Sequence, residues 1–227
     1  MSEGDKRTSS SDYPRPSLTA DVVLFSLDDA HRLAVLLIQR GKDPFAGHWA
    51  IPGGFCEPGE SVEESAAREL QEETGIEGLP LDQLKTFSRP GRDPRGWVVS
   101  VAHVSVLPSD RRAEAVGGDD ASEARWWTIV RERDGSLGLE HGGERGAALA
   151  FDHDEILKAA VEHLGERVEQ LALGMLPATF TLEDARRAFE AALGCPVDIA
   201  SFEEAVFDEE LVEEAGGGLL RVAGGGR

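Results

Sequence analysis

The segment from Gly53 to Ile76, GGFCEPGESVEESAARELQEETGI, constrains the fold of this chain most strongly. Ser61, followed three residues later by Glu64, forms a capping-box pattern, so a helix is predicted to begin there. Gly75 suits the left-handed backbone position that ends many helices. Residues at every fourth position supply the stripe that this helix would bury, namely Ala66, Leu70 and Thr74.

Three carboxylates share one face of this predicted helix. Glu69, Glu72 and Glu73 stand at positions i, i+3 and i+4. Like charges this close repel one another and raise one another's pKa values unless a cation neutralises them. Carboxylate oxygens are hard ligands that favour Mg²⁺ or Mn²⁺, and such an ion also binds phosphate groups. The alternative interpretation of the same pattern is a solvated acidic helix face.

The composition is that of a globular protein of 227 residues, 41% hydrophobic and 29% charged. No apolar run is long enough to span a membrane. The net charge of −20 repels polyanions, although a divalent cation allows an acidic protein to act on phosphates. Cys56 and Cys195 match no metal-binding or redox spacing, so we expect two reduced thiols and a cytoplasmic location.

Short runs rich in Val, Leu and Ile predict the strands of an α/β domain. These runs are Leu18–Phe25, Leu33–Gln39, Trp97–Leu107 and Arg125–Val130. The stretch RERDGSLGLEHGGERGA, residues 131–147, is polar and rich in glycine. Because it has no hydrophobic period, we predict a loop there and place a domain boundary at its end.

The pattern changes after this loop. Residues 154–173 have helical spacing, Thr181 and Asp184 form a second capping-box pattern, and Ser201–Glu214 is a third candidate helix. The glycine-flanked stretch GGGLLRVAGGG is compatible with a terminal hairpin. We therefore expect a disordered tail over 1–16, an α/β domain over 17–150 and a small helical domain over 151–227.

The carboxylate segment resembles the Nudix box at every defined position. Gly54, five residues, Glu60, seven residues and then the run from Arg68 to Ile76 reproduce the family pattern. This resemblance implies an α/β/α sandwich. It also implies a metal-dependent hydrolase that cleaves a nucleoside diphosphate linked to another moiety, in which the ion activates water and offsets charge on the diphosphate.

The same resemblance implies roles for individual residues. The expected metal ligands, which are also the catalytic groups, are Glu69, Glu72 and Glu73, with the Gly53 carbonyl completing the coordination of Mg²⁺ or Mn²⁺. The expected structural positions of the box are Gly54, Glu60, Arg68 and Gly75. A further carboxylate outside the box commonly acts in this family, and the candidates are Asp119, Asp120 and above all Glu123. Each of the three is otherwise a solvated loop acid.

The stretch FSRPGRDPRG resembles Nudix proteins that act on ADP-ribose and NAD metabolites. Pro90, Arg92 and Arg95 are the expected substrate-binding residues, because a guanidinium group matches the geometry of phosphate oxygens. A solvent-exposed arginine pair is the alternative. Either Phe87 or Trp97 is a candidate to stack on adenine, although core packing is the commoner role of such rings. The resemblance favours hydrolysis of ADP-ribose to AMP and ribose 5-phosphate.

The C-terminal part resembles the winged-helix segment of Nudix-related transcriptional regulators of NAD metabolism, which sense ADP-ribose and bind DNA. Its charge departs from theirs, because residues 151–227 contain 17 acidic side chains against 6 Lys and Arg. DNA affinity depends on neutralising phosphates, so we expect no DNA binding and favour an enzyme. The family resemblance favours a homodimer. The alternatives are an ADP-ribose-sensing regulator and a protein-docking or DNA-mimicking acidic domain.

Overall fold

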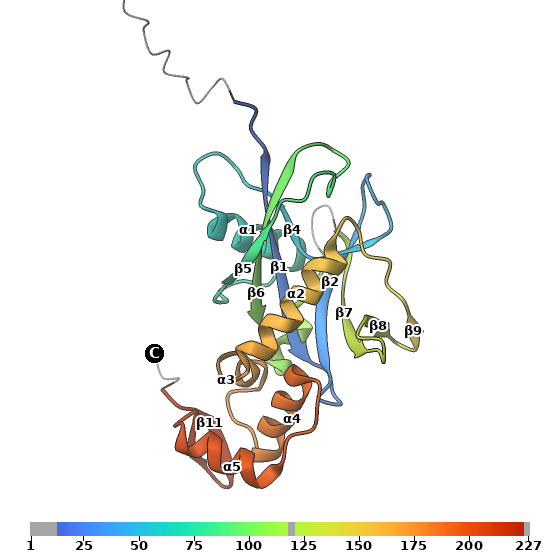
Figure 1. Ribbon diagram of the computed structural model, residues 1–227. Helices are drawn as coiled ribbons and strands as arrows, with labels where there is room; N and C mark the ends of the chain where they lie inside the picture. Colours follow the sequence, from blue (N-terminus) through green and yellow to red (C-terminus); the bar gives the residue numbers. More distant parts are fainter. Residues whose placement is uncertain (1–12, 118–120, 225–227) are drawn as a thin grey trace, which may run out of the picture.

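Figure 1 shows the computed structural model of the chain, which describes residues 13–117 and 121–224. Most of the predicted tail, together with Asp119 and Asp120, lies outside the described residues. Within the described ranges, no helix has the length and apolar character needed to cross a membrane.

A large mixed sheet forms the centre of the molecule. Its strands are β1 (Ser17–Leu27), β2 (Leu33–Arg40), β3 (Trp49–Ala50), β4 (Gly53–Phe55), β5 (Asp82–Phe87), β6 (Val98–Val106), β7 (Ala121–Arg131), β8 (Leu137–His141) and β9 (Glu144–Arg145). They run in the order β5-β6-β1-β2-β7-β8-β9, while β3 pairs with β2 and β4 with β1. β1 and β6 are parallel, and β1 is antiparallel to β2 and β4. The four strands predicted from apolar runs are confirmed.

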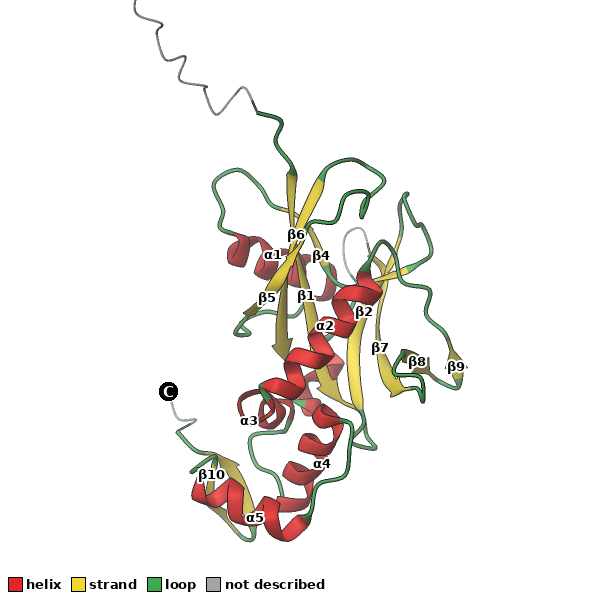
Figure 2. Cartoon of the chain, in the orientation of Figure 1, coloured by secondary structure: helices red, strands yellow, loops and turns green. Residues whose placement is uncertain are grey.

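The remaining elements cover the sheet or extend from its end, as Figure 2 shows. The helices are α1 (Val62–Thr74), α2 (His153–Glu166), α3 (Val168–Leu171), α4 (Leu182–Leu193) and α5 (Ile199–Asp208), with 3-10 turns η2 (Ser109–Glu114) and η3 (Ala172–Met175). A terminal hairpin contains β10 (Val212–Gly216) and β11 (Leu219–Val222).

Strand β1 is buried on both faces, and its alternation assigns each face to a helix. Val22 and Leu24 belong to an apolar cluster with Leu70 of α1. Val23 and Phe25 belong to the larger cluster that includes the buried side of α2. Successive side chains of a strand point to opposite faces, so a fully apolar strand is stable only between two covering layers. The predicted α/β/α sandwich is confirmed.

Helix α1 begins and ends where the sequence predicts. The Glu64 backbone N–H donates to the Ser61 hydroxyl at 3.2 Å, and the Ser61 N–H donates to the Glu64 carboxylate at 2.7 Å. Gly75 has φ 74°, and its N–H donates to the Gln71 carbonyl at 2.8 Å. The predicted stripe is buried, so α1 has a fixed rotation about its axis relative to the sheet.

The prediction of a loop over 131–147 was wrong. β8 and β9 extend the sheet there, and Leu139 of β8 is buried opposite Ile129 of β7. The turn at Asp134 and Gly135 lets the chain reverse directly onto β7, with Gly135 at φ 84°. Two strands of five and two residues are too short to give a hydrophobic period.

The C-terminal elements follow the predicted order with different bounds. The predicted helix over 154–173 divides into α2, α3 and η3, because the backbone of Arg167 (φ −111°, ψ 28°) leaves the helical region. α5 begins at Ile199 because Asp198 caps it, accepting the Ser201 N–H at 3.0 Å. It ends at Asp208 rather than Glu214, because β10 occupies the following residues.

The two parts of the chain share one hydrophobic core. Phe189 of α4 and Phe202 of α5 pack edge to face with ring centroids 4.9 Å apart, and both belong to the cluster that contains the α2 face of the sheet. Helices and hairpin give the predicted winged-helix-like order of elements. The domain boundary at residue 150 stays a prediction. Helix α2 belongs to the predicted second domain, yet it packs against the sheet of the first.

Candidate active site

The α1 carboxylates differ in their environments. The Glu72 side chain lies at the surface, while Glu69 is half-buried and Glu73 is buried. Glu69 and Glu72 both accept hydrogen bonds from Nη1 of Arg68, at 2.8 Å and 3.0 Å. Arg68 therefore holds the two carboxylates together and screens their mutual repulsion.

Glu73 projects from α1 toward the backbone that precedes the helix. Its carboxylate accepts the Gly53 N–H at 2.9 Å. Burial raises the pKa of Glu73 to about 8, against the lowering effect of the Gly53 N–H, and the charges of Glu69 and Asp21 raise it further. A carboxylate in this position is stable as an anion only when a cation lies beside it.

Two glycines allow the backbone to approach these carboxylates. A Cβ at Gly54 would lie 2.4 Å from an oxygen of Glu69, and one at Gly53 would lie 2.4 Å from the Ala20 carbonyl. β4 pairs with β1 at this point, Asp21 facing Gly53. The glycines of the box are thus required by the close packing of α1, β4 and β1.

Arg68 and Glu60 have the structural relation that the box implies. Two nitrogens of Arg68 donate to the Glu60 carboxylate, Nε at 3.1 Å and Nη2 at 2.9 Å. These bonds, with one from the Glu57 backbone, lower the pKa of Glu60 to about 2. The loop before α1 is therefore tied to the second turn of the helix, which fixes the loop against the carboxylates.

A cleft of about 530 Å³ opens over these groups. The three α1 carboxylates form one wall, the backbone of the Gly53–Pro58 loop another, and Arg95 reaches it from the β5–β6 connection. Arg40 and Lys42 line it as well. A cleft with carboxylates on one side and cationic side chains around them suits a divalent ion together with a phosphate-bearing ligand.

The donor set fits a hard divalent ion. All of the donors are oxygens, and Glu73 is a buried carboxylate whose pKa a neighbouring cation would lower. Over the described residues, however, no three His, Cys, Asp or Glu side chains already converge as a metal cage. Arg68 contacts one oxygen each of Glu69 and Glu72, and the second oxygen of each carboxylate accepts no hydrogen bond from Arg68.

Arg92 is placed differently from an exposed phosphate ligand. Its guanidinium forms a two-pronged ion pair with Asp152, at 2.9 Å and 2.7 Å, and the side chains are only 4% and 3% exposed. The alternative of a solvent-exposed arginine is wrong for Arg92, and its substrate contact stays a prediction. Arg92 instead joins the β5–β6 connection to the start of α2.

The residue after Asp152 supports the catalytic loop from the same side. Nδ1 of His153 accepts the Ile51 N–H at 2.9 Å. Burial lowers the pKa of His153 to about 3, so the ring stays neutral and can accept this bond at neutral pH. The beginning of α2 thus positions the chain two residues before Gly53.

Aromatic rings gather beside the cleft in strained backbone. Phe45 and Phe151 have φ of 66° and 55°, and their ring centroids are 4.8 Å apart. Such conformations cost energy in bulky residues and concentrate at functional sites. The Arg95 guanidinium lies 4.7 Å from the centroid of exposed Phe55 and 5.2 Å from that of Phe151. Arg95 also pairs with Asp93 at 2.6 Å.

Asp21 is a buried acid that the sequence interpretation missed. It accepts a hydrogen bond from the Ser100 hydroxyl beneath Gly53. Burial raises the pKa of Asp21 to about 6, and the Ser100 bond opposes this. A single acidic residue inside the apolar run LTADVVLF was the available signal, because a strand buried on both faces has no place for an unpartnered carboxylate.

The remaining predicted residues are not among those that line the cleft of the α1 carboxylates. Glu123 is on β7, and its carboxylate accepts two bonds from Arg125, at 2.9 Å and 2.6 Å. Pro90 is exposed in the β5–β6 connection. Phe87 is buried in the core, and Trp97 is exposed. The catalytic role of Glu123 and the substrate contact of Pro90 stay predictions.

Comparison with known proteins identifies the family. The NUDIX domain profile matches residues 16–136, which is more than half of the chain. The chain belongs to the Nudix family. Among curated relatives of this Nudix protein is the "ADPR responsive transcriptional repressor NtrR" of Acinetobacter baylyi, 33% identical over 208 residues that cover 90% of this chain and 77% of the relative.

Two further proteins are similar to this Nudix chain over different lengths. The "ADP-ribose pyrophosphatase" of Methanocaldococcus jannaschii is 39% identical over 125 residues, which cover 55% of this chain and 63% of the relative. The crystal structure of Shewanella oneidensis NrtR complexed with a 27mer DNA superposes with a TM-score of 0.72 and 29% identity, covering 91% of this chain and 92% of that one. Because the NrtR structure covers 91% of this chain, its similarity extends to the C-terminal elements.

The buried ion pair yields a stability prediction. Asp152→Asn should lower the free energy of unfolding by about 3 kcal/mol, because it leaves the Arg92 charge buried without a counter-charge. The matched control is Glu155→Gln, which breaks the exposed pair with Arg89, whose side chains are 62% and 53% exposed. That change should cost less than about 1 kcal/mol. Urea unfolding followed by circular dichroism measures both, and equal losses would contradict the assignment.

Proposed function

We propose that this protein is a metal-dependent Nudix pyrophosphohydrolase that cleaves ADP-ribose to AMP and ribose 5-phosphate. The observation that carries the proposal is the intact set of α1 carboxylates on the wall of one cleft, with Glu73 buried against the Gly53 N–H. A purely binding domain has no need to keep a buried carboxylate of raised pKa.

Each residue of the cleft has a role in this proposal. Glu69, Glu72 and Glu73 hold a divalent ion, Mg²⁺ or Mn²⁺, with the Gly53 carbonyl. When bound, the ion supplies a Lewis acid that offsets diphosphate charge and activates water. One α1 carboxylate orients the attacking water, and Glu123 remains a candidate for a further base. Arg68 and Glu60 keep the loop and helix in register.

The choice of ADP-ribose is supported by the cationic side of the cleft. Arg95 has a guanidinium at the cleft, stacked on the exposed Phe55 ring, which suits contact with phosphate and ribose oxygens. Pro90 and Arg92 belong to the same connection, where Arg92 holds its base through Asp152. Two relatives that act on or respond to ADP-ribose by name agree with this substrate.

The predicted homodimer is part of the same proposal. It is motivated by the family resemblance. Size-exclusion chromatography with light scattering tests it, and a monomer at micromolar concentration would contradict it.

The substrate assignment is tested by hydrolysis in the presence of Mg²⁺ or Mn²⁺. We expect ADP-ribose to be converted to AMP and ribose 5-phosphate, detected by chromatography, and EDTA to abolish the reaction. NAD(H), diadenosine polyphosphates and nucleoside triphosphates are the comparison substrates. If the protein cleaves a nucleoside triphosphate and leaves ADP-ribose intact, the substrate is wrong while the reaction class stands.

The carboxylates are tested by one pair of substitutions on α1. Glu73→Gln keeps the shape of the side chain and should lower kcat at least about a hundredfold, because a ligand charge is lost. Glu64→Gln should leave kcat nearly unchanged, since the glutamine carbonyl can still accept the Ser61 N–H that Glu64 accepts at 2.7 Å. Equal losses would show that the helix, not the metal site, had been damaged.

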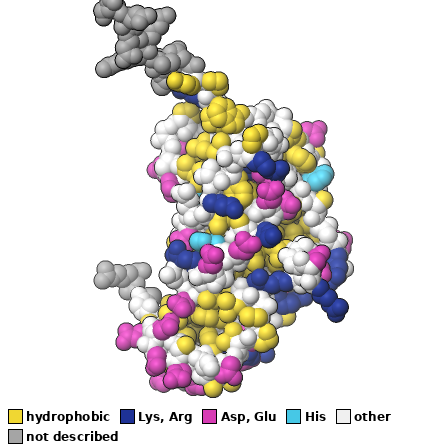
Figure 3. All heavy atoms as spheres, viewed as in Figure 1, with side chains coloured by type: hydrophobic (Ala, Val, Ile, Leu, Met, Phe, Trp, Pro, Cys, Tyr) yellow, Lys and Arg dark blue, Asp and Glu magenta, His cyan; other side chains and the backbone are white. Residues whose placement is uncertain are grey.

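An ADP-ribose-sensing regulator is the second candidate. It is favoured by the superposition on the DNA complex of NrtR, which includes the C-terminal elements. The charge of those elements opposes it, because α5 and the residues after it carry Glu203, Glu204, Asp208, Glu209 and Glu210. Figure 3 shows Asp and Glu side chains gathered over this end of the molecule. Phosphates would be repelled there.

The arginines of α4 do not restore a basic surface. Arg186 pairs with Glu183 at 2.8 Å and with Glu190, and Arg187 pairs with Glu183 at 2.8 Å. The partners stand three or four residues apart, which is the spacing of neighbours on one helix face. Both guanidinium groups are therefore balanced by carboxylates of the same helix, and we propose that the protein does not regulate transcription by binding DNA.

A polarisation assay with duplexes from the upstream regions of its own and neighbouring NAD-metabolism genes tests this. At about 50 mM salt, where electrostatic binding is strong, we expect no saturable binding at sub-micromolar protein. A sequence-specific complex that ADP-ribose dissociates would replace the enzyme with the regulator as the function of the protein.

A further inference from the structure

A second cleft lies where the sheet meets the C-terminal helices. It has a volume of about 760 Å³ and is lined by the β1–β2 turn, the end of β7, strands β8 and β9, one side of α4 and the turn that follows α4. Strand β2 separates this second cleft from the catalytic cleft. Leu33 at the start of β2 lines the second cleft, and Arg40 at the end of β2 lines the catalytic cleft. At about 3.3 Å per residue, the two ends are roughly 23 Å apart.

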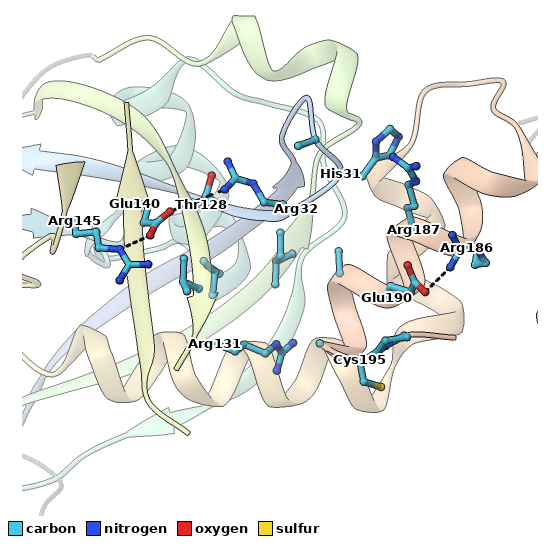
Figure 4. A pocket seen from close by; sticks show the side chains of 17 residues that line it. His31, Arg32, Thr128, Arg131, Glu140, Arg145, Arg186, Arg187, Glu190 and Cys195 are labelled. Carbon is cyan, nitrogen blue, oxygen red and sulfur yellow. Dashed lines mark hydrogen bonds and ion pairs between the residues drawn. The ribbon is translucent and has the colours of Figure 1, made fainter. Parts of the chain in front are cut away.

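The charge of this cleft is opposite to that of the chain. Its lining includes two glutamates, Glu140 and Glu190, but five arginines, namely Arg32, Arg131, Arg145, Arg186 and Arg187. The whole protein has only 23 Lys and Arg and a net charge of −20. Arginines outnumber glutamates in this lining, and an excess of one charge on a concave surface attracts oppositely charged ligands. Figure 4 shows these guanidinium groups arranged around the opening from both the sheet and α4.

Arg131 differs from the other four arginines. Its Nη2 donates to the Ala192 carbonyl at the end of α4 at 2.6 Å, and no carboxylate in the described ranges pairs with it. A Cβ at residue 194 would lie 2.1 Å from its Nε, so Gly194 is required for this packing. The guanidinium is thus held in place by neutral groups, with its positive charge uncompensated. Partial desolvation lowers the pKa of Arg131, which also indicates a missing counter-charge.

The arginines at the rim can exchange their partners. Arg32 pairs with Asp28 at 2.8 Å, Arg145 pairs with Glu140, and Arg187 pairs with Glu183 at 2.8 Å. All three arginine side chains are well exposed, and exposed ion pairs contribute little stability. An anion with several charged oxygens can therefore replace these carboxylates at small cost. Guanidinium groups match phosphate oxygens particularly well.

We propose that this arginine cleft is a binding site for a small phosphate-bearing anion, separate from the catalytic cleft. Arg131 supplies a charge that no carboxylate of the described residues pairs with, and Arg145 and Arg187 contact the anion from the sheet side and the α4 side. The volume is in the range of sites for nucleotide-sized molecules. A ligand there would bridge the sheet and α4. The proposal does not depend on which reaction the Nudix site performs.

The probe is inorganic pyrophosphate, titrated into the full-length protein by calorimetry in EDTA. Without a divalent ion, the carboxylates of the catalytic cleft repel this anion, so binding reports on the arginine cleft. We expect saturable binding. Arg131→Gln should weaken it at least about tenfold, the loss typical of one charge-assisted contact. The control is Arg133→Gln, an exposed arginine outside the lining, which should leave the affinity within about twofold if the effect is local.

A second variant keeps the test decisive if Arg131→Gln does not fold. The double change Arg145→Gln and Arg187→Gln alters only exposed rim side chains and should also weaken binding of pyrophosphate severalfold. The proposal is overturned if the wild-type protein does not bind pyrophosphate, or if these variants and Arg133→Gln bind it equally well. Binding of a DNA duplex that requires Arg131, with no binding of pyrophosphate, would assign the cleft to nucleic acid and overturn it too.

Discussion

The hydrogen bond from the Gly53 N–H to Glu73 is the contact on which the catalytic cleft depends. It exists because α1 packs on β1 and β4 closely enough that only glycine fits at positions 53 and 54. The cost of burying Glu73 is the raised pKa of its carboxyl group. The charged form of Glu73 therefore destabilises the folded protein unless a bound cation balances its charge.

Support for this contact comes from the opposite face of the sheet. The Arg92–Asp152 pair and the bond from the Ile51 N–H to His153 attach the beginning of α2 to the segments on either side of the cleft. Residues 152 and 153 lie beyond the matched NUDIX region, which ends at residue 136. The catalytic geometry therefore relies on a helix that also continues the core toward α4.

The distribution of charge separates this protein from a typical DNA-binding arrangement. The charged residues of α5 are all acidic, where a recognition helix would need cations, while arginines concentrate in the cleft between the sheet and α4. The similarity to NrtR spans both parts of the chain, so fold alone does not decide between enzyme and regulator. The sign of the charge at each surface is the observation on which the proposal of an enzyme rests.

Local pattern determined the strands, the two capping boxes, the ends of α1 and the face that its carboxylates share, because these depend on residues a few positions apart. The β8–β9 extension and the bounds of α5 did not follow from it, since short strands gain stability mainly from their partners. Tertiary structure alone decided that Arg92 pairs with Asp152, 60 residues away, and that Arg131 lies against Gly194. The physical reason is that the sequence around an arginine does not specify its ion-pair partner. Folding decides whether a carboxylate from a distant part of the chain lies close enough to pair with it.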